Sequence, residues 1–206
     1  MAAPFRLVRG DPAPRQQTPT TCGSACLAVA RMLANPPLAD WIRHGDPDRT
    51  GSESPEDRFA AYEQVVAGRT NGLVGADGRL QPPWPRALGT PPWGARGEVE
   101  RGVAPTPCRY RTTWFRFVAR RRLEQVHGEL QRRTTESGPA LLYVGSSSLP
   151  RHVVLVLPPS ADLDPDVYEP STGHVVGLPR EPFVTRRLGL AGWDVPWCAV
   201  WPAGGH

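Results

Sequence analysis

The hydrophobic period of the chain changes at Gly138 and Pro139, from helical spacing to the two-residue alternation of strands. The segments predicted as helices precede this point, and the short runs predicted as strands follow it. Helices are predicted over 22–34, 55–68 and 114–133, and strands over 140–145, 152–157, 166–169, 174–178, 183–188 and 197–201. Helices first and strands later predict an α+β fold in which a C-terminal, mainly antiparallel β-sheet packs against the N-terminal helix.

Two of these segments constrain the core. Residues 152–157 read His-Val-Val-Leu-Val-Leu, which is apolar on both faces of a strand and predicts a central position in the sheet. The segment 22–34 is dense in Ala, Leu, Val and Met until Asn35 and two prolines stop it. We expect this first helix to lie against the sheet.

A length of 206 residues with 39% hydrophobic content fits one domain with a substantial core. We therefore predict a single domain over 1–206. Residues 1–19, rich in Pro and Arg, predict an extended N-terminal segment. Residues 44–107 predict a largely irregular insertion, because from 69 onward Gly and Pro crowd around Trp84 and Trp93. Such a stretch is either a binding loop or lid, or a solvent-facing insertion.

All 24 basic residues are Arg, and the net charge is +4. The densest cluster falls on the predicted helix 114–133, where a solvated face is the usual explanation, so no nucleic-acid partner is predicted. The sequence lacks a window of about 18 consecutive apolar residues, so no membrane-spanning helix is predicted. Residues 1–14 lack the apolar region of a signal peptide, which predicts a cytoplasmic location, with signal-independent export left open.

Cys22 opens the first helix, capped by Thr20 or Thr21, and Gln16 precedes it by six positions. A helix N-terminus beside an imidazolium favours the thiolate, which is the nucleophilic form of cysteine. The Gln16 amide and the Cys22 backbone N–H could together stabilise an oxyanion, worth roughly 3 kcal/mol per donor. Gly23 would let a substrate backbone approach closely.

His152 is the expected base, because it begins the most hydrophobic strand. If the chain turns at 158–163 and returns antiparallel over 164–169, His152 lies opposite Glu169, and directly opposed residues share one face. Glu169 could then orient one imidazole nitrogen while the other faces Cys22, which is the logic of acyl transfer. Trp84 and Trp93 are the expected substrate contacts.

Other interpretations of the cysteines carry less weight. A cysteine early in an apolar helix is more often a buried small hydrophobe, which is the interpretation we give to Cys26. Zinc binding by Cys22, Cys26, His152 and His174 is disfavoured, because Cys-x3-Cys within one helix is a poor ligand geometry; no metal or cofactor is predicted. Cys108 and Cys198 could pair in an exported protein and are otherwise free thiols.

These residues resemble the papain-like cysteine peptidases. The resemblance rests on Gln16, on Cys-Gly-Ser-Ala-Cys at 22–26, on His-Val-Val at 152–154 and on Tyr-Glu-Pro-Ser-Thr-Gly at 168–173. Within that superfamily the sequence is most similar to bacterial C39-like peptidases and to related papain-fold effector proteases. The resemblance implies Cys22 as nucleophile, His152 as general base and acid, Glu169 as orienting group and Gln16 as oxyanion donor.

The resemblance also implies a cysteine protease that cleaves a peptide or isopeptide bond of a peptide or protein substrate. One departure stands out: the family pattern has Asp or Asn where this chain has Glu169, so that Asp164 or Asp166 is an alternative acid. Protein deamidation or transglutamination by a toxin or effector would use the same site. The alternative that is not an enzyme is a papain-fold binding protein that has lost catalysis. The only sequence feature that favours it is Glu169 in place of the usual Asp or Asn.

Overall fold

The computed structural model describes residues 4–46, 53–103 and 108–204. Its elements, in chain order, are α1 (Cys22–Ala34), α2 (Pro36–His44), α3 (Pro55–Asn71), the 3-10 turn η1 (Arg86–Leu88), α4 (Pro92–Gly102), β1 (Tyr110–Trp114), α5 (Arg120–Glu136), β2 (Ala140–Gly145), β3 (Pro150–Leu157), β4 (Asp166–Glu169), β5 (His174–Gly177), α6 (Arg180–Thr185) and β6 (Val195–Pro202). The order of helices and strands gives an α+β protein.

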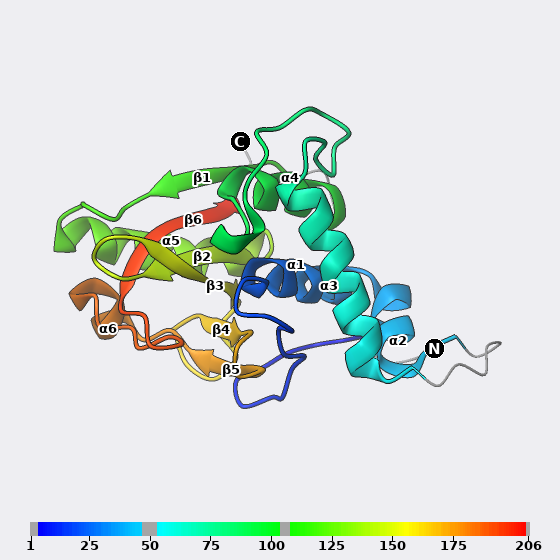
Figure 1. Cartoon of the computed structure of the whole chain (residues 1–206). Coiled ribbons are helices and arrows are strands. Elements are labelled where there is room, and N and C mark those ends of the chain that lie inside the picture. The colour runs from blue at the N-terminus through cyan, green and yellow to red at the C-terminus, as the bar shows by residue number, and fades with distance from the viewer. Residues whose placement is uncertain (1–3, 47–52, 104–107, 205–206) are drawn as a thin grey trace.

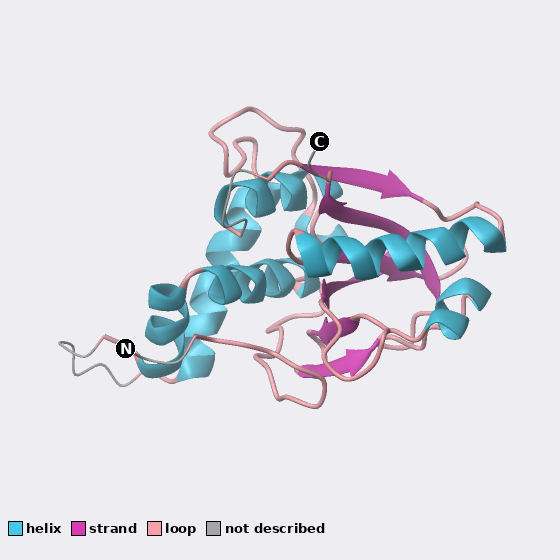
Figure 2. Cartoon of the chain, turned by 180° about the vertical axis from the view of Figure 1, so that it is seen from behind, coloured by secondary structure: helices cyan, strands magenta, loops and turns pink. Residues whose placement is uncertain are grey.

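A six-stranded sheet forms the central layer, with strand order β1-β6-β2-β3-β4-β5 and every neighbouring pair antiparallel. Helices α1 to α4 gather on one face, and α5 and α6 cover the other, as the opposite views of Figures 1 and 2 show. The expected α+β class is therefore confirmed: the helix that carries Cys22 packs against an antiparallel sheet.

The strand β3 is buried on both faces, as its composition predicts. Val153 and Leu155 belong to the core shared with α1, whereas Val154 and Val156 belong to the core shared with α5. Helix α1 is enclosed in turn between the sheet and helices α3 and α4, with the stretch from Ala25 to Ala30 fully buried. Its many small side chains allow this close approach on every side.

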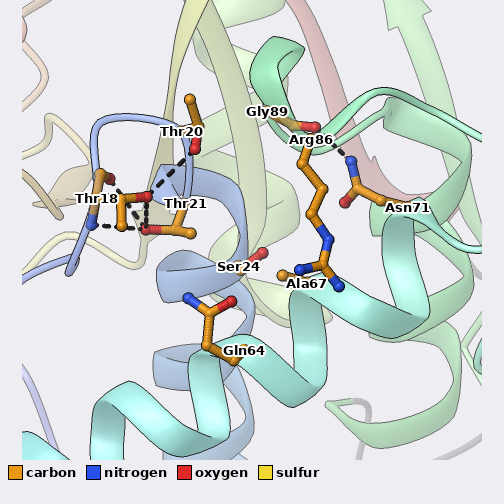
Figure 3. Close-up of a pocket in the computed structure, with 9 residues that line it drawn as sticks. All are labelled: Thr18, Thr20, Thr21, Ser24, Gln64, Ala67, Asn71, Arg86 and Gly89. Atoms are coloured by element: carbon orange, nitrogen blue, oxygen red, sulfur yellow. Dashed lines mark hydrogen bonds between the residues drawn. The ribbon is translucent and has the colours of Figure 1, made fainter.

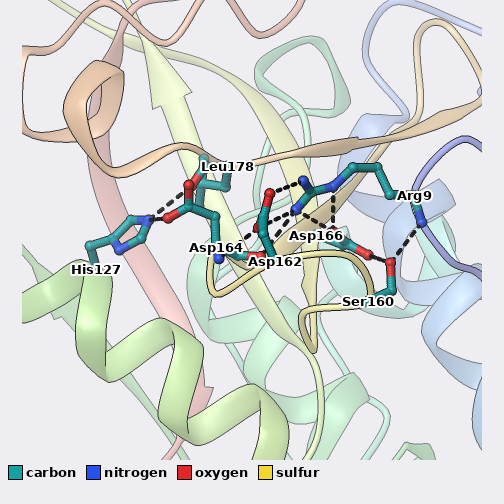
Figure 4. A network of polar contacts seen from close by, with 7 residues as sticks. All are labelled: Arg9, His127, Ser160, Asp162, Asp164, Asp166 and Leu178. Carbon is teal, nitrogen blue, oxygen red and sulfur yellow. Dashed lines mark hydrogen bonds and ion pairs between the residues drawn. The ribbon is translucent and has the colours of Figure 1, made fainter.

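The N-terminal segment lies along the outer edge of β5. Backbone N–H groups of Gly10 and Ala13 donate to the carbonyls of Val175 and Gly173, at 2.9 and 2.7 Å. A polar network adds to this pairing (Figure 4): Arg9 donates to the buried carboxylate of Asp166 at 2.9 Å and to Asp162 at 3.0 Å. These contacts fix the chain that leads to Cys22.

Two elements differ from the sequence-based prediction. Residues 110–114 form strand β1, which pairs with β6, and the helix predicted over 114–133 begins six residues later, at Arg120. The predicted strand 183–188 does not form: residues 183–185 are the end of helix α6, whose Phe183 and Val184 pack against α5. In both cases the local sequence is compatible with either a helix or a strand, and the tertiary contacts select one of them.

The stretch from 69 onward is also more regular than its composition suggests. Helix α4 runs from Pro92 to Gly102 with Pro92 in its first turn, where the missing N–H costs nothing. Its buried Ala95 and Val99 complete the packing around α1. Pro and Gly residues usually predict irregular structure, but here they lie at the start and the end of a helix.

We expect Arg9→Ala to lower the free energy of unfolding by about 2 kcal/mol, because it leaves the fully buried carboxylate of Asp166 without its cation. Urea unfolding followed by circular dichroism measures the loss. Arg6→Ala, an exposed position on the same segment, is the control and should change stability by less than about 0.5 kcal/mol. Equal effects of the two substitutions would contradict the role of Arg9.

Candidate active site

Three predicted site residues meet at one end of the sheet. Cys22 is the first residue of α1, His152 lies near the start of β3, and Glu169 is the last residue of β4. Because β3 and β4 are antiparallel, the start of one strand and the end of the other lie together. The fold thus brings together residues that are up to 147 positions apart in the sequence, the separation of Cys22 and Glu169.

The His152 ring bridges the other two residues. Its Nε2 lies 2.7 Å from Oε1 of Glu169, and both side chains are only 5% exposed. The Cys22 thiol lies beside the imidazole and acts to raise its pKa. Since Nε2 is engaged by Glu169, Nδ1 is the ring nitrogen that remains for the sulfur.

The predicted strand register is wrong by two residues. The observed pairs are Leu155 with Tyr168 and Val156 with Val167, and extending them by alternation places Glu169 opposite Val154 rather than His152. A shift of two keeps both side chains on the same face but makes them diagonal neighbours, with Cα atoms about 7–8 Å apart in such a pair. The extra methylene of Glu provides part of the reach across this diagonal. Its length therefore suits this register.

Glu169 is held as a carboxylate by the turn that follows it. Ser171 donates its N–H to Oε1 at 2.9 Å and its hydroxyl to Oε2 at 2.7 Å, and the Thr172 N–H donates to Oε2 at 3.0 Å. Burial acts to raise the pKa of Glu169, but the bonds from His152 and Ser171 outweigh it and lower the pKa to about 2. The carboxylate is therefore charged at neutral pH.

His152 shows the complementary shift. Burial acts to lower its pKa, while the hydrogen bonds to Cys22 and Glu169 outweigh burial and raise the pKa to about 9. The alternative acids are engaged elsewhere: Asp166 accepts from Arg9, and Asp164 lies 3.6 Å from His127. Glu169 is thus the acid that contacts His152.

A cavity of about 440 Å3 opens beside Cys22 and His152. Its lining is mainly apolar and aromatic, and includes Trp84, Trp93, Trp114, Tyr143, Leu88 and Leu149. The two tryptophans expected to contact substrate both lie on its wall, with their ring centroids 5.1 Å apart in an edge-to-face arrangement. The indole N–H of Trp93 donates to the Pro82 carbonyl at 3.1 Å.

Gln16 and Gly23 are placed differently from the prediction. The amide of Gln16 donates to the Thr18 carbonyl at 2.7 Å, its oxygen is buried without a hydrogen-bond partner in the described structure, and the residue does not line the cavity. A Cβ on Gly23 would stand 2.5 Å from the Thr90 Cβ. Glycine at 23 therefore makes room for Thr90, a reason that differs from the expected approach of substrate.

The remaining cysteines and histidines have other surroundings. All four cysteines are free, so Cys108 and Cys198 do not pair. Cys26 is fully buried, with its thiol 3.4 Å from the Val153 carbonyl. Among the described residues, no three His, Cys, Asp or Glu side chains gather where they could hold a metal ion. Within the same residues, no helix has the length and apolar character needed to cross a membrane.

The sequence analysis missed several residues of the site. Thr90 packs on Gly23, and its carbonyl accepts the Tyr143 hydroxyl at 3.1 Å. Ser171 and Thr172 hold Glu169, for which the Glu-Pro-Ser-Thr-Gly turn offered a local signal, because Ser and Thr after an acid often bind its side chain. No local signal marked Thr90, because its position depends on the fold of the 72–91 segment.

No protein-family model matches the chain, and no curated protein matches it. Among solved structures, the chain is similar to the Pseudomonas avirulence protein AvrPphB, with 13% sequence identity and a TM-score of 0.47. The similarity covers 93% of this chain and 95% of that one. The assignment of function below rests on the geometry of the site.

We expect Glu169→Gln to bring the pKa of His152 from about 9 down to or below the ordinary histidine value of about 6.5, because burial then opposes the charge with one partner fewer. The contribution of the pair to stability is full between about pH 4.5 and 6.5. It is lost as pH rises through about 9 or falls through about 2. An NMR titration of the imidazole resonances measures the shift.

Ser171→Ala is the control for this titration, since it removes one hydrogen bond to Glu169 but keeps the carboxylate beside the ring. Its His152 pKa should stay above the ordinary value. A His152 pKa that is the same in the Glu169→Gln variant as in the unaltered protein would show that the ion pair does not set the charge of the ring.

Proposed function

We propose that this protein is a cysteine-dependent hydrolase that cleaves a peptide or isopeptide bond through an acyl-enzyme on Cys22. The observation that carries the proposal is the hydrogen bond of the buried His152 ring to the Glu169 carboxylate, with the Cys22 thiol beside that ring on the wall of the same cavity. A nucleophile at a helix start, a base and an orienting acid are the three parts that acyl transfer needs.

The proposed reaction has two steps. In the first, the Cys22 thiolate, paired with the His152 imidazolium, attacks the carbonyl carbon; a C–S bond forms, the C–N bond breaks and the imidazolium protonates the leaving amine. In the second step, neutral His152 accepts a proton from a water molecule while the water oxygen attacks the thioester carbonyl. The C–S bond then breaks, releasing the acid and regenerating the ion pair.

The oxyanion of each step needs donors close to Cys22. The first N–H groups of a helix have no acceptor within the helix, so the Cys22 N–H at the start of α1 is the first proposed donor. Gln16 is the second proposed donor. To act, its amide must leave the Thr18 carbonyl and turn toward the cavity, which costs one hydrogen bond.

The cavity supports a peptide as substrate. Its aromatic and aliphatic lining, next to a thiol and an imidazole, suits an apolar segment of peptide chain beside the bond that reacts. The 2.7 Å contact between Glu169 and His152 supports the enzyme over an inactive binding protein, because the longer acid still reaches the ring.

We expect iodoacetamide at about pH 6 to alkylate Cys22 at least about 100-fold faster than any other cysteine. Burial raises the pKa of Cys26, Cys108 and Cys198, which keeps those thiols protonated at this pH. Mass spectrometry of tryptic peptides over time measures the four rates. Cys108, which is only partly buried, is the internal reference for a solvent-accessible thiol outside the site.

His152→Ala should abolish the advantage of Cys22, provided that its circular dichroism spectrum and melting temperature show a folded protein. Equal, slow labelling of all four thiols in the unaltered protein would refute the enzyme and leave a binding protein. If Cys22 is labelled fastest, the next experiment is a peptide-library cleavage screen, in which the Cys22→Ser variant is the inactive control.

A further inference from the structure

A second pocket adjoins the catalytic cavity on the side of α3. It encloses about 180 Å3 and shares Thr20 and Gly89 with the larger cavity. Figure 3 shows it between the start of α1, helix α3 and the segment that carries Arg86. Ligand pockets for whole small molecules are typically about 300–1,000 Å3, so this volume suits a single side chain.

The lining of this pocket differs in character from that of the catalytic cavity. Hydroxyl groups of Thr18, Thr20, Thr21 and Ser24 lie along one side, and the Gln64 amide comes from α3. The threonine hydroxyls are held in place by bonds within the turn, such as Thr18 to Thr21 at 3.2 Å. One charged side chain lines the pocket, the guanidinium of Arg86, and no carboxylate does.

Arg86 is a solvent-exposed residue that lines this pocket. Within the described residues it forms no ion pair or side-chain hydrogen bond, whereas Arg9, Arg31 and Arg69 each lie close to a carboxylate. Its side chain extends into the pocket in Figure 3, and its guanidinium lies against α3, where a Cβ on Gly68 would be 3.9 Å from Nη2. A guanidinium carries five N–H donors, and the lining of this pocket includes no carboxylate that could accept from them.

The backbone that carries Arg86 is anchored. The Asn71 side chain, at the end of α3, donates to the Gly89 carbonyl at 2.7 Å, so η1 is tied to the helix that forms the opposite wall. Just before the threonine turn, the Gln17 N–H donates to the Glu63 carboxyl at 3.2 Å, which ties this turn to α3. Burial raises the pKa of Glu63 to about 7, so much of its charge is neutralised near neutral pH.

We propose that this pocket is a specificity subsite that binds an anionic side chain of the peptide substrate while an apolar residue occupies the catalytic cavity. The inference rests on the proposed function and adds the class of substrate: a peptide with an acidic or phosphorylated residue close to the bond that reacts. A guanidinium fork with neighbouring hydroxyls suits a carboxylate or a phosphoryl group, which share the same acceptor chemistry.

The test measures binding without catalysis, in the full-length Cys22→Ala variant. Three sets of acetylated heptapeptide amides carry Leu at the centre and Ala elsewhere, with Glu, phosphoserine or Gln placed at each other position in turn. Isothermal titration calorimetry gives their dissociation constants at fixed ionic strength. We expect at least one position at which Glu or phosphoserine binds about tenfold tighter than Gln, and the preferred anion identifies the source of the charge.

Adding Arg86→Gln should bring the ratio of the dissociation constants of the neutral and anionic peptides to about one. The affinity for the Gln peptide should not change. Arg121→Gln, an exposed arginine on α5, is the matched control and should keep the full ratio. Equal binding of charged and neutral peptides at every position, or a preference that survives Arg86→Gln, would overturn the subsite. Because the binding test uses a variant without Cys22, its result does not depend on catalysis. An anion preference in that variant, together with slow alkylation of Cys22 in the unaltered protein, would refute the hydrolase but keep the pocket as an anion-binding site.

Discussion

The packing of helix α1 against the sheet is the constraint on which the site depends. From Cys22 to Ala30 the helix is buried on every side, and its first turn reaches a cavity, where Cys22 is 3% exposed. A displacement by one helical turn, about 5.4 Å, would remove the thiol from the His152 ring. The small side chains that let α1 approach β3 so closely therefore also set the position of the nucleophile.

The buried ion pair of His152 and Glu169 fits a functional role better than a stabilising one. Removing two charges from water costs several kcal/mol per ion, and the attraction between them repays this only with good geometry and further hydrogen bonds. Here the turn at 171–172 provides those bonds to the carboxylate. An apolar pair would pack as well, but it could neither charge the imidazole nor orient it toward Cys22.

The sequence predicted the fold class and the contact between His152 and Glu169, but not the register that produces the contact. Alternation with period two determines which face a side chain occupies, so an error of two residues leaves the face correct. The length of the turn between β3 and β4 decides the register, and composition does not encode it. The same limit explains α6: Phe183 and Val184 suit a buried strand or a buried helix, and the packing against α5 decides.

The segment between α3 and α4 shows how an irregular stretch can build a defined wall. The last carbonyls of a helix need partners from outside it. Gln81 donates to the carbonyls of Arg69, Thr70 and Gly72, at 2.9, 3.1 and 3.0 Å, and Asn71 donates to Gly89. A motion of this segment as a lid would have to break these bonds and expose the carbonyls they satisfy. The Gly and Pro residues make this segment look irregular in the sequence. Its side-chain hydrogen bonds nevertheless hold it in place, so that Trp84 and Arg86 line adjoining cavities.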